Sequence, residues 1–194
     1  MASVGIISMG KMGSTIAHSL IDSGHKVFYA SDSRSKKTKQ NAIELNAKDV
    51  VFPEKLFEIC DYVFCIIKDG DWRTYAEMAI DAEFTGIYVD FNGLDENDAE
   101  WITERFTDSS IRYVDGAMRA WPISEQKEVP EAGNPAFDNF EPRTMYLSGK
   151  DAQNVINLFK GNFWKFRECQ PPAKYVVLDI ASMQQSGMEY PFNI

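Results

Sequence analysis

Cysteine and histidine are scarce in this chain of 194 residues, which contains three cysteines and two histidines. The cysteines, Cys60, Cys65 and Cys169, include no C-x-x-C pair, and neither they nor the histidines have the spacing of metal ligands. This scarcity argues against a disulfide-stapled secreted fold. It predicts a reduced, cytoplasmic setting and no bound metal.

Basic residues are also in the minority, with 20 Lys and Arg against 29 Asp and Glu and a net charge of −9. A nucleic-acid surface needs a basic stripe, so this balance argues against a nucleic-acid partner. No apolar run reaches the length of about 18 residues that a membrane span requires. The N-terminal apolar stretch lacks the basic segment that opens a signal peptide. No membrane association is therefore expected.

Short apolar runs alternate with helical patterns over the first two-thirds of the chain. The expected strands lie at residues 4–7, 26–30, 62–67, 87–90 and 111–115. The main expected helices lie between them, at residues 14–22, 36–45, 72–80 and 95–106. Near-continuous apolar strands separated by helices are typical of a parallel sheet covered on both faces. The sequence therefore predicts an α/β fold of the Rossmann type, doubly wound around a mostly parallel sheet.

The pattern changes in residues 122–142, which contain four prolines and few apolar residues. This segment predicts an insertion at about 123–142 that is either a lid over a pocket or a longer surface loop. Strands are expected again at 143–147 and 163–167, and a last helix is expected from residue 172 to about 186. We expect two parts: a Rossmann domain at 1–168, and a C-terminal helix and tail at 169–194.

A glycine-rich loop lies directly between the first expected strand and the first expected helix. It reads Ser8-Met9-Gly10-Lys11-Met12-Gly13. This is G-x-G-x-x-G with its first glycine replaced by serine, and such a loop lets a phosphate approach the amides at a helix N-terminus. A tight turn without a ligand is the alternative. The strand before the loop, the helix after it and a further strand within ~30 residues favour dinucleotide binding.

The loop after the second expected strand bears on which dinucleotide binds. Asp32 lies about 20 residues after the glycine loop, where an acidic residue binds a ribose 2′-hydroxyl and selects NAD. Hydroxyl and basic groups also gather there, at Ser31, Ser33, Arg34, Ser35, Lys36 and Lys37. These groups suit the 2′-phosphate of NADP. We expect NADP(H), with NAD(H) as the less favoured cofactor and a solvated loop as the alternative without a ligand.

Residues 5–13, which read G-I-I-S-M-G-K-M-G, resemble the N-terminus of the β-hydroxyacid dehydrogenases and of the related imine reductases. Ser33-Arg34-Ser35 resembles the N-R-[ST] loop of that family. The resemblance implies that Arg34 contacts the 2′-phosphate of NADP.

Two later segments resemble the same family. Residues 89–93, V-D-F-N-G, are similar to its D-x-[NS]-[TS] motif, which implies that Asn92 lies beside the nicotinamide and the substrate. Residues 113–122 and 145–149 are similar to the imine-reductase pattern L-D-G-A followed by L-Y-S-G. Ile67 and Lys68, at the end of an expected strand, are the other residues expected to frame the nicotinamide.

The resemblance also implies a catalytic group on the last expected helix. Hydroxyacid dehydrogenases carry a lysine there, but the matching positions of this chain hold none. Imine reductases carry Asp or Tyr in a run similar to residues 178–181, L-D-I-A, which makes Asp179 the expected proton donor. A carboxylate stabilises an iminium, whereas an ammonium would repel it. Tyr175, one turn earlier, is expected to line the same pocket, and a structural role is the alternative for both residues.

The implied activity is an NADPH-dependent hydride transfer to the C=N or C=O bond of a small organic substrate. Relatives continue into a helical C-terminal domain that closes the substrate pocket. The expected helix at 172–186 is apolar nearly all round, so we expect it to be buried in a homodimer or against another partner chain. Two alternatives stay open: a hydroxyacid dehydrogenase with altered catalytic residues, and a non-redox protein such as a repurposed isomerase, cyclase or binding scaffold.

Overall fold

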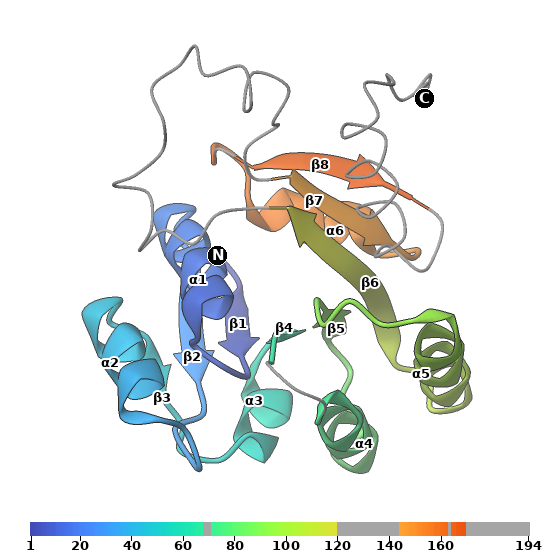
Figure 1. Ribbon diagram of the computed structural model, residues 1–194, viewed down its shortest axis with the longest axis horizontal. Helices are drawn as coiled ribbons and strands as arrows, with labels where there is room; N and C mark the ends of the chain where they lie inside the picture. The colour runs from blue at the N-terminus through green and yellow to red at the C-terminus, as the bar shows by residue number, and fades with distance from the viewer. Residues whose placement is uncertain (68–70, 120–143, 163, 170–194) are drawn as a thin grey trace.

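The computed structural model describes residues 1–67, 71–119, 144–162 and 164–169 (Figure 1). The strands are β1 (Ser3–Ile6), β2 (Lys26–Tyr29), β3 (Lys48–Asp49), β4 (Tyr62–Cys65), β5 (Ile87–Asp90), β6 (Arg112–Arg119), β7 (Thr144–Ser148) and β8 (Lys165–Glu168). The helices are α1 (Lys11–Asp22), α2 (Lys36–Glu44), α3 (Glu54–Ile59), α4 (Trp72–Asp81), α5 (Glu96–Asp108) and α6 (Ala152–Leu158).

The strands form one eight-stranded sheet in the order β3-β2-β1-β4-β5-β6-β7-β8 (Figure 1). Every neighbouring pair is parallel except β6 and β7, which are antiparallel. The strand order reverses at β1, which has β2 on one side and β4 on the other. The carboxyl ends of β1 and β4 are therefore the topological switch point, where ligands of such sheets bind. This doubly wound arrangement confirms the predicted Rossmann-type fold.

Two apolar clusters cover the two faces of the sheet. The cluster on one face includes Ile16 and Leu20 of α1 and Val155 of α6, and the cluster on the other includes side chains of α3, α4 and α5. Along β4, Phe64 belongs to the first cluster, whereas Val63 and Cys65 belong to the second. This alternation is what a strand buried on both faces requires.

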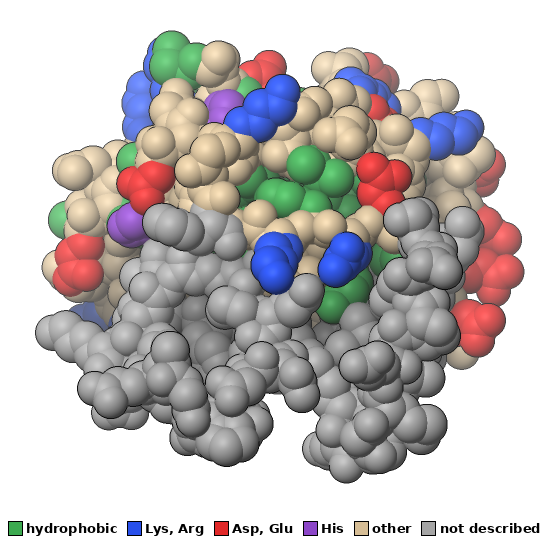
Figure 2. Space-filling view, turned by 90° about the horizontal axis from the view of Figure 1, so that it is seen from above, with side chains coloured by type: hydrophobic (Ala, Val, Ile, Leu, Met, Phe, Trp, Pro, Cys, Tyr) green, Lys and Arg blue, Asp and Glu red, His purple; other side chains and the backbone are tan. Residues whose placement is uncertain are grey.

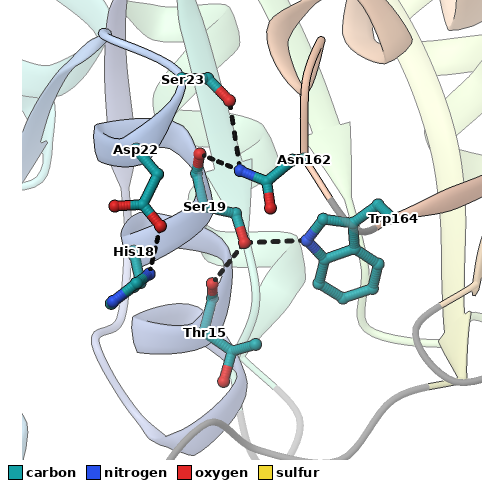
Figure 3. A network of polar contacts seen from close by, with 7 residues as sticks. All are labelled: Thr15, His18, Ser19, Asp22, Ser23, Asn162 and Trp164. Atoms are coloured by element: carbon teal, nitrogen blue, oxygen red, sulfur yellow. Dashed lines mark hydrogen bonds and ion pairs between the residues drawn. The ribbon is translucent and has the colours of Figure 1, made fainter.

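A polar network fastens the segment after α6 to α1 (Figure 3). Trp164 donates its Nε1–H to the hydroxyl of Ser19 at 2.9 Å, and Ser19 donates to the carbonyl of Thr15 at 3.2 Å. Asn162 donates from Nδ2 to the carbonyl of Ser19 at 2.8 Å. Ser19 and Trp164 are buried, so the bond between their side chains is shielded from water. The network holds the β8 end of the sheet against the helix that follows the glycine loop.

We expect Trp164→Phe to lower the free energy of unfolding by about 1–3 kcal/mol, because it leaves the buried Ser19 hydroxyl without its donor and removes part of a packed ring. Urea unfolding followed by circular dichroism measures the change. Combination with Ser19→Ala should cost less than the sum of the two single changes, because the orphaned hydroxyl is then gone. Strict additivity of the two changes would contradict the coupling.

The described elements differ from the expected ones mainly at their ends. α1 begins at Lys11, three residues earlier than expected, because Gly10 is already its N-cap. β4 ends at Cys65, so Ile67 lies beyond the strand. β6 extends to Arg119 because β7 pairs with it over residues 115–119. The insertion expected at 123–142 and the last helix, with Tyr175 and Asp179, lie outside the described residues.

The described surface carries dispersed charge on the side that faces up in Figure 1. Figure 2 shows an apolar patch there that is bordered by both basic and acidic side chains, with further Asp and Glu side chains toward the rim. In the part of the chain that the structure describes, no helix combines the length and the apolar character needed to cross a membrane.

Candidate functional site

The glycine loop leads from β1 into α1 at the carboxyl edge of the sheet. Gly10 caps α1, and its carbonyl accepts the Ser14 N–H at 2.9 Å. An α-helix leaves its first amides without acceptors inside the helix, so these N–H groups are available to a ligand. No acidic side chain lies in the first turn of α1. The helix N-terminus therefore offers a site for an anion.

The two glycines of this loop have different surroundings. A Cβ at Gly13 would lie 1.9 Å from the carbonyl oxygen of Ser8, so glycine is required for α1 to pack this closely against the loop. A Cβ at Gly10 would meet no atom of the described residues within 4 Å. The loop is thus tightly packed at Gly13 and open at Gly10, which fits the approach of a dinucleotide pyrophosphate to the backbone.

The remaining loop residues anchor this geometry. Met9 is fully buried, and its carbonyl accepts a hydrogen bond from Nδ2 of Asn41 on α2 at 2.8 Å. Lys11 is exposed in the first turn of α1, and Met12 is half-buried beside it. Sequence reasoning missed Asn41, whose only signal is a polar residue within a short helix. Its contact with Met9 ties the position of the loop to that of α2.

The serines after β2 have separate local roles. Ser31 is buried and hydrogen-bonds to Asp49. Burial raises the pKa of Asp49, but hydrogen bonds from Ser31 and Val51 outweigh it and lower that pKa. Ser33 has a φ of 55° and donates its hydroxyl to Asp32 at 3.0 Å. The hydroxyl of Ser35 accepts the Thr38 N–H at 3.2 Å and so caps α2.

Arg34 extends from this loop to α4. Its Nη2 donates to the hydroxyl of Tyr75, and its guanidinium carbon lies 5.4 Å from the centre of the Tyr75 ring. Lys36 and Lys37 follow in the exposed first turn of α2, which contains no acidic residue. Cations at a helix N-terminus add to the positive end of the helix dipole. Arg34, Lys36 and Lys37 therefore create a positive potential beside the end of β2, which attracts an anion.

Asn92 joins the ends of β4 and β5. Its Oδ1 accepts the Ile67 N–H at 2.7 Å, while its backbone N–H and its Nδ2 donate to the two carboxylate oxygens of Asp90 at 2.7 and 2.8 Å. Nδ2 also lies 3.2 Å from the Sγ of Cys65. The structure thus brings the expected residues Asn92 and Ile67 together, and Asn92 positions both strand ends. Lys68 lies outside the described residues.

Three neighbouring strands place Cys65, Asp90 and Asp115 side by side in register, and all three are buried. Burial raises the pKa of Asp90 to about 7; hydrogen bonds from Asn92 oppose the increase, and the charges of Asp115 and Asp98 add to it. Burial also raises the pKa of the Cys65 thiol. Sequence reasoning assigned no role to Asp90, although a carboxylate that ends an apolar strand is a signal. Within the described ranges, no three His, Cys, Asp or Glu side chains are grouped to hold a metal ion.

The glycine loop, the Arg34 loop and the Asn92 contacts follow β1, β2, β4 and β5, so they share one edge of the parallel part of the sheet. This fold and this arrangement define a dinucleotide-binding domain of the Rossmann type. Residues 3–124 match the family described as the NAD binding domain of 6-phosphogluconate dehydrogenase, and the chain belongs to that family.

A curated relative of this chain is the chloroplastic glyoxylate/succinic semialdehyde reductase 2 of Arabidopsis thaliana, which is 26% identical over 149 residues. The match covers 74% of this chain and 40% of the relative. The matched part of this chain therefore spans less than half the length of that reductase.

Solved structures with a similar fold include the imine reductase of Myxococcus stipitatus in complex with NADP+. Its TM-score is 0.69 at 16% identity, and the match covers 95% of this chain and 61% of that chain. A variant of that enzyme in complex with NAD+ has a TM-score of 0.69 at 16% identity, and the match covers 96% of this chain and 62% of that chain. The 3-hydroxyisobutyrate dehydrogenase of Mycobacterium tuberculosis also has a TM-score of 0.69 at 16% identity, and the match covers 96% of this chain and 62% of that chain. Such identities show a shared fold, and this chain spans less than two thirds of each protein.

Proposed function

We propose that this chain binds NADP(H) along the carboxyl edge of β1, β2, β4 and β5. The observation that carries the proposal is the loop between β1 and α1, where Gly13 packs against the Ser8 carbonyl and Gly10 leaves open space at the helix N-terminus. A pyrophosphate needs this combination of close approach and available amides. Membership of an NAD-binding family supports a nicotinamide dinucleotide.

The residues after β2 support NADP over NAD. Arg34 is partly buried near the edge, and Lys36 and Lys37 are exposed one turn away. A guanidinium with two ammonium groups favours a 2′-phosphate over a 2′-hydroxyl. Asp32, the residue that would bind the 2′-hydroxyl of NAD, is exposed and accepts a hydrogen bond from the Ser33 hydroxyl.

We propose further that the protein is an oxidoreductase that reduces the C=N or C=O bond of a small organic substrate, as imine reductases and hydroxyacid dehydrogenases do. The nicotinamide supplies a hydride when bound. In this chain, Asn92 fixes Ile67 and the ends of β4 and β5, which would orient the ring. Asp179 would donate the proton, and Tyr175 would line the substrate pocket. A homodimer formed through residues 169–194 and a cytoplasmic setting stay predictions.

Fluorescence titration of the purified chain with NADPH and NADH tests cofactor binding. We expect NADPH to bind with a Kd about tenfold or more below that of NADH, and we expect Arg34→Gln to remove most of this difference by weakening NADPH alone. Arg105→Gln is the matched control, because Arg105 lies in the last turn of α5 and pairs with Glu77. Equal affinity for both nucleotides would contradict the NADP preference, and binding of neither would contradict the function.

The same preparation tests the reaction. Oxidation of NADPH in the presence of cyclic imines, and not of ketoacids, would support the imine-reductase activity. Asp179→Ala should then slow turnover while leaving the Kd for NADPH unchanged, because a proton donor acts on the substrate. An Asp179→Ala variant as fast as the parent would remove Asp179 from the mechanism.

A further inference from the structure

The guanidinium of Arg34 has one nitrogen with a hydrogen-bond acceptor and a neighbouring nitrogen without one among the described residues. Nε and Nη2 lie on the same edge of the group. Nη2 donates to the Tyr75 hydroxyl, whereas Nε is buried and has no hydrogen-bond partner in the part of the chain that the structure describes. A buried donor without an acceptor costs free energy. An oxyanion that binds this edge through two parallel N–H···O bonds would satisfy both nitrogens, which the single oxygen of a phenol does not.

The contact between Arg34 and Tyr75 spans the proposed cofactor edge. Arg34 follows β2 and Tyr75 lies on α4, which follows β4, and in the sheet β1 lies between β2 and β4. The guanidinium thus contacts a side chain from the far side of β1, the strand that leads into the glycine loop.

We propose that Tyr75 is a specificity-determining residue, whose hydroxyl holds the anion-binding edge of Arg34 until the 2′-phosphate of NADP(H) replaces it. This inference rests on the proposed function. A 2′-phosphate on Nε and Nη2 makes two hydrogen bonds to Arg34 where the phenol oxygen makes one, and its bulk takes the place of the phenol. The 2′-hydroxyl of NAD(H) offers one oxygen and gains nothing over Tyr75. Tyr75 thus lowers the affinity for NADP(H) below the value that Arg34 alone would give.

Tyr75→Phe isolates this competition, because it removes the oxygen and keeps the ring that lies against the guanidinium. Calorimetric titration of the full chain with NADPH, NADH and adenosine 2′,5′-bisphosphate measures the effect. We expect Tyr75→Phe to lower the Kd for NADPH and for the bisphosphate by about three- to tenfold. The Kd for NADH should stay within about twofold of the parent value, because its 2′-hydroxyl does not compete for Arg34.

Tyr62→Phe is the matched control. Tyr62 is a half-buried tyrosine near another arginine, Arg112. It begins β4, so it lies at the amino end of the strand, away from the carboxyl ends where the cofactor is proposed to bind. This variant should bind all three ligands as the parent does. An unchanged Kd for NADPH in Tyr75→Phe would overturn the inference. A higher Kd would also overturn it, by showing that Tyr75 orients Arg34 for the phosphate.

A second measurement separates this inference from the proposed function. A double-mutant cycle of Arg34→Gln and Tyr75→Phe, followed by urea unfolding without any nucleotide, reports whether the contact exists. No coupling between the two changes would overturn the inference even if NADPH binds. If the cycle shows coupling but the parent chain binds no nucleotide, the proposed function is contradicted, and the role of Tyr75 fails with it.

Discussion

Gly13→Ala should leave the chain largely unfolded, whereas Gly10→Ala should fold and lose affinity for the dinucleotide. The added Cβ at Gly13 would lie 1.9 Å from the Ser8 carbonyl oxygen. Both are backbone-anchored atoms, so no change of rotamer relieves the clash, and α1 would have to move away from β1. We expect a loss of about 3 kcal/mol or more in the free energy of unfolding.

Gly10→Ala tests the other side of the same loop. Gly10 has φ −66° and ψ −169°, which alanine adopts without strain. Alanine is a poorer N-cap than glycine, so a loss of at most about 1 kcal/mol is expected. Its Cβ enters the open space above the loop, where the pyrophosphate would approach, and should raise the Kd for NADPH about tenfold or more.

Thermal melts by circular dichroism and nucleotide titration distinguish the two variants. If Gly13→Ala melted with the parent, the close contact with Ser8 would not be needed for the fold. If Gly10→Ala bound NADPH as tightly as the parent, the dinucleotide would not cross this loop. In the second case the central support for the proposed function would be lost while the fold remained intact.

The glycine loop was predictable from the sequence because its signals are local. An apolar run, a glycine-rich stretch and a helical period follow one another within residues 4–22. The close approach at Gly13 does not depend on the side chain of residue 8, because the group that meets Gly13 is the Ser8 carbonyl, which every residue possesses.

The contacts across the sheet edge were not predictable, because they join residues that are distant in the chain. Arg34 and Tyr75 are 41 positions apart, and neither position alone indicates the other. Ser31, a predicted cofactor residue, hydrogen-bonds to Asp49 next to β2, a contact that the sequence does not indicate. The strand expected at 62–67 was too long, because Ile66 and Ile67 continue the apolar run after pairing with β5 ends at Cys65. The hydrophobic pattern of a sequence predicts which residues are buried, but it is a poor predictor of the residue at which pairing between two strands ends.

Asp90→Asn should make the stability of the protein less dependent on pH between about 5 and 8. Burial raises the pKa of this carboxyl from 3.8 to about 7. Between these values the folded protein keeps a proton that the unfolded chain has released. The contribution of Asp90 to stability is therefore fully present below about pH 4 and is lost as the pH rises to about 7, by a total of about 4 kcal/mol.

Other shifted carboxyl groups act in a different range. Hydrogen bonding to Arg112 lowers the pKa of Asp151, and the pKa of Asp49 is lowered as well, because its hydrogen bonds outweigh its burial. Their stabilising contributions are present above pH 4 and are lost only as the pH falls further. Between pH 5 and 8 the slope from Asp90 is therefore opposed by neither of these groups.

Urea unfolding at pH 5 and pH 8 measures this slope directly. The parent should lose about 2–4 kcal/mol more than Asp90→Asn over this interval, because asparagine does not titrate. Asp108→Asn, the same change at an exposed carboxyl at the end of α5, is the control and should keep the slope of the parent. Asparagine has one acceptor oxygen for the two N–H donors of Asn92, so the variant should also be less stable than the parent at pH 5. Equal slopes in parent and variant would mean that Asp90 is ionised throughout this range, and that the Asn92 hydrogen bonds hold a buried charge.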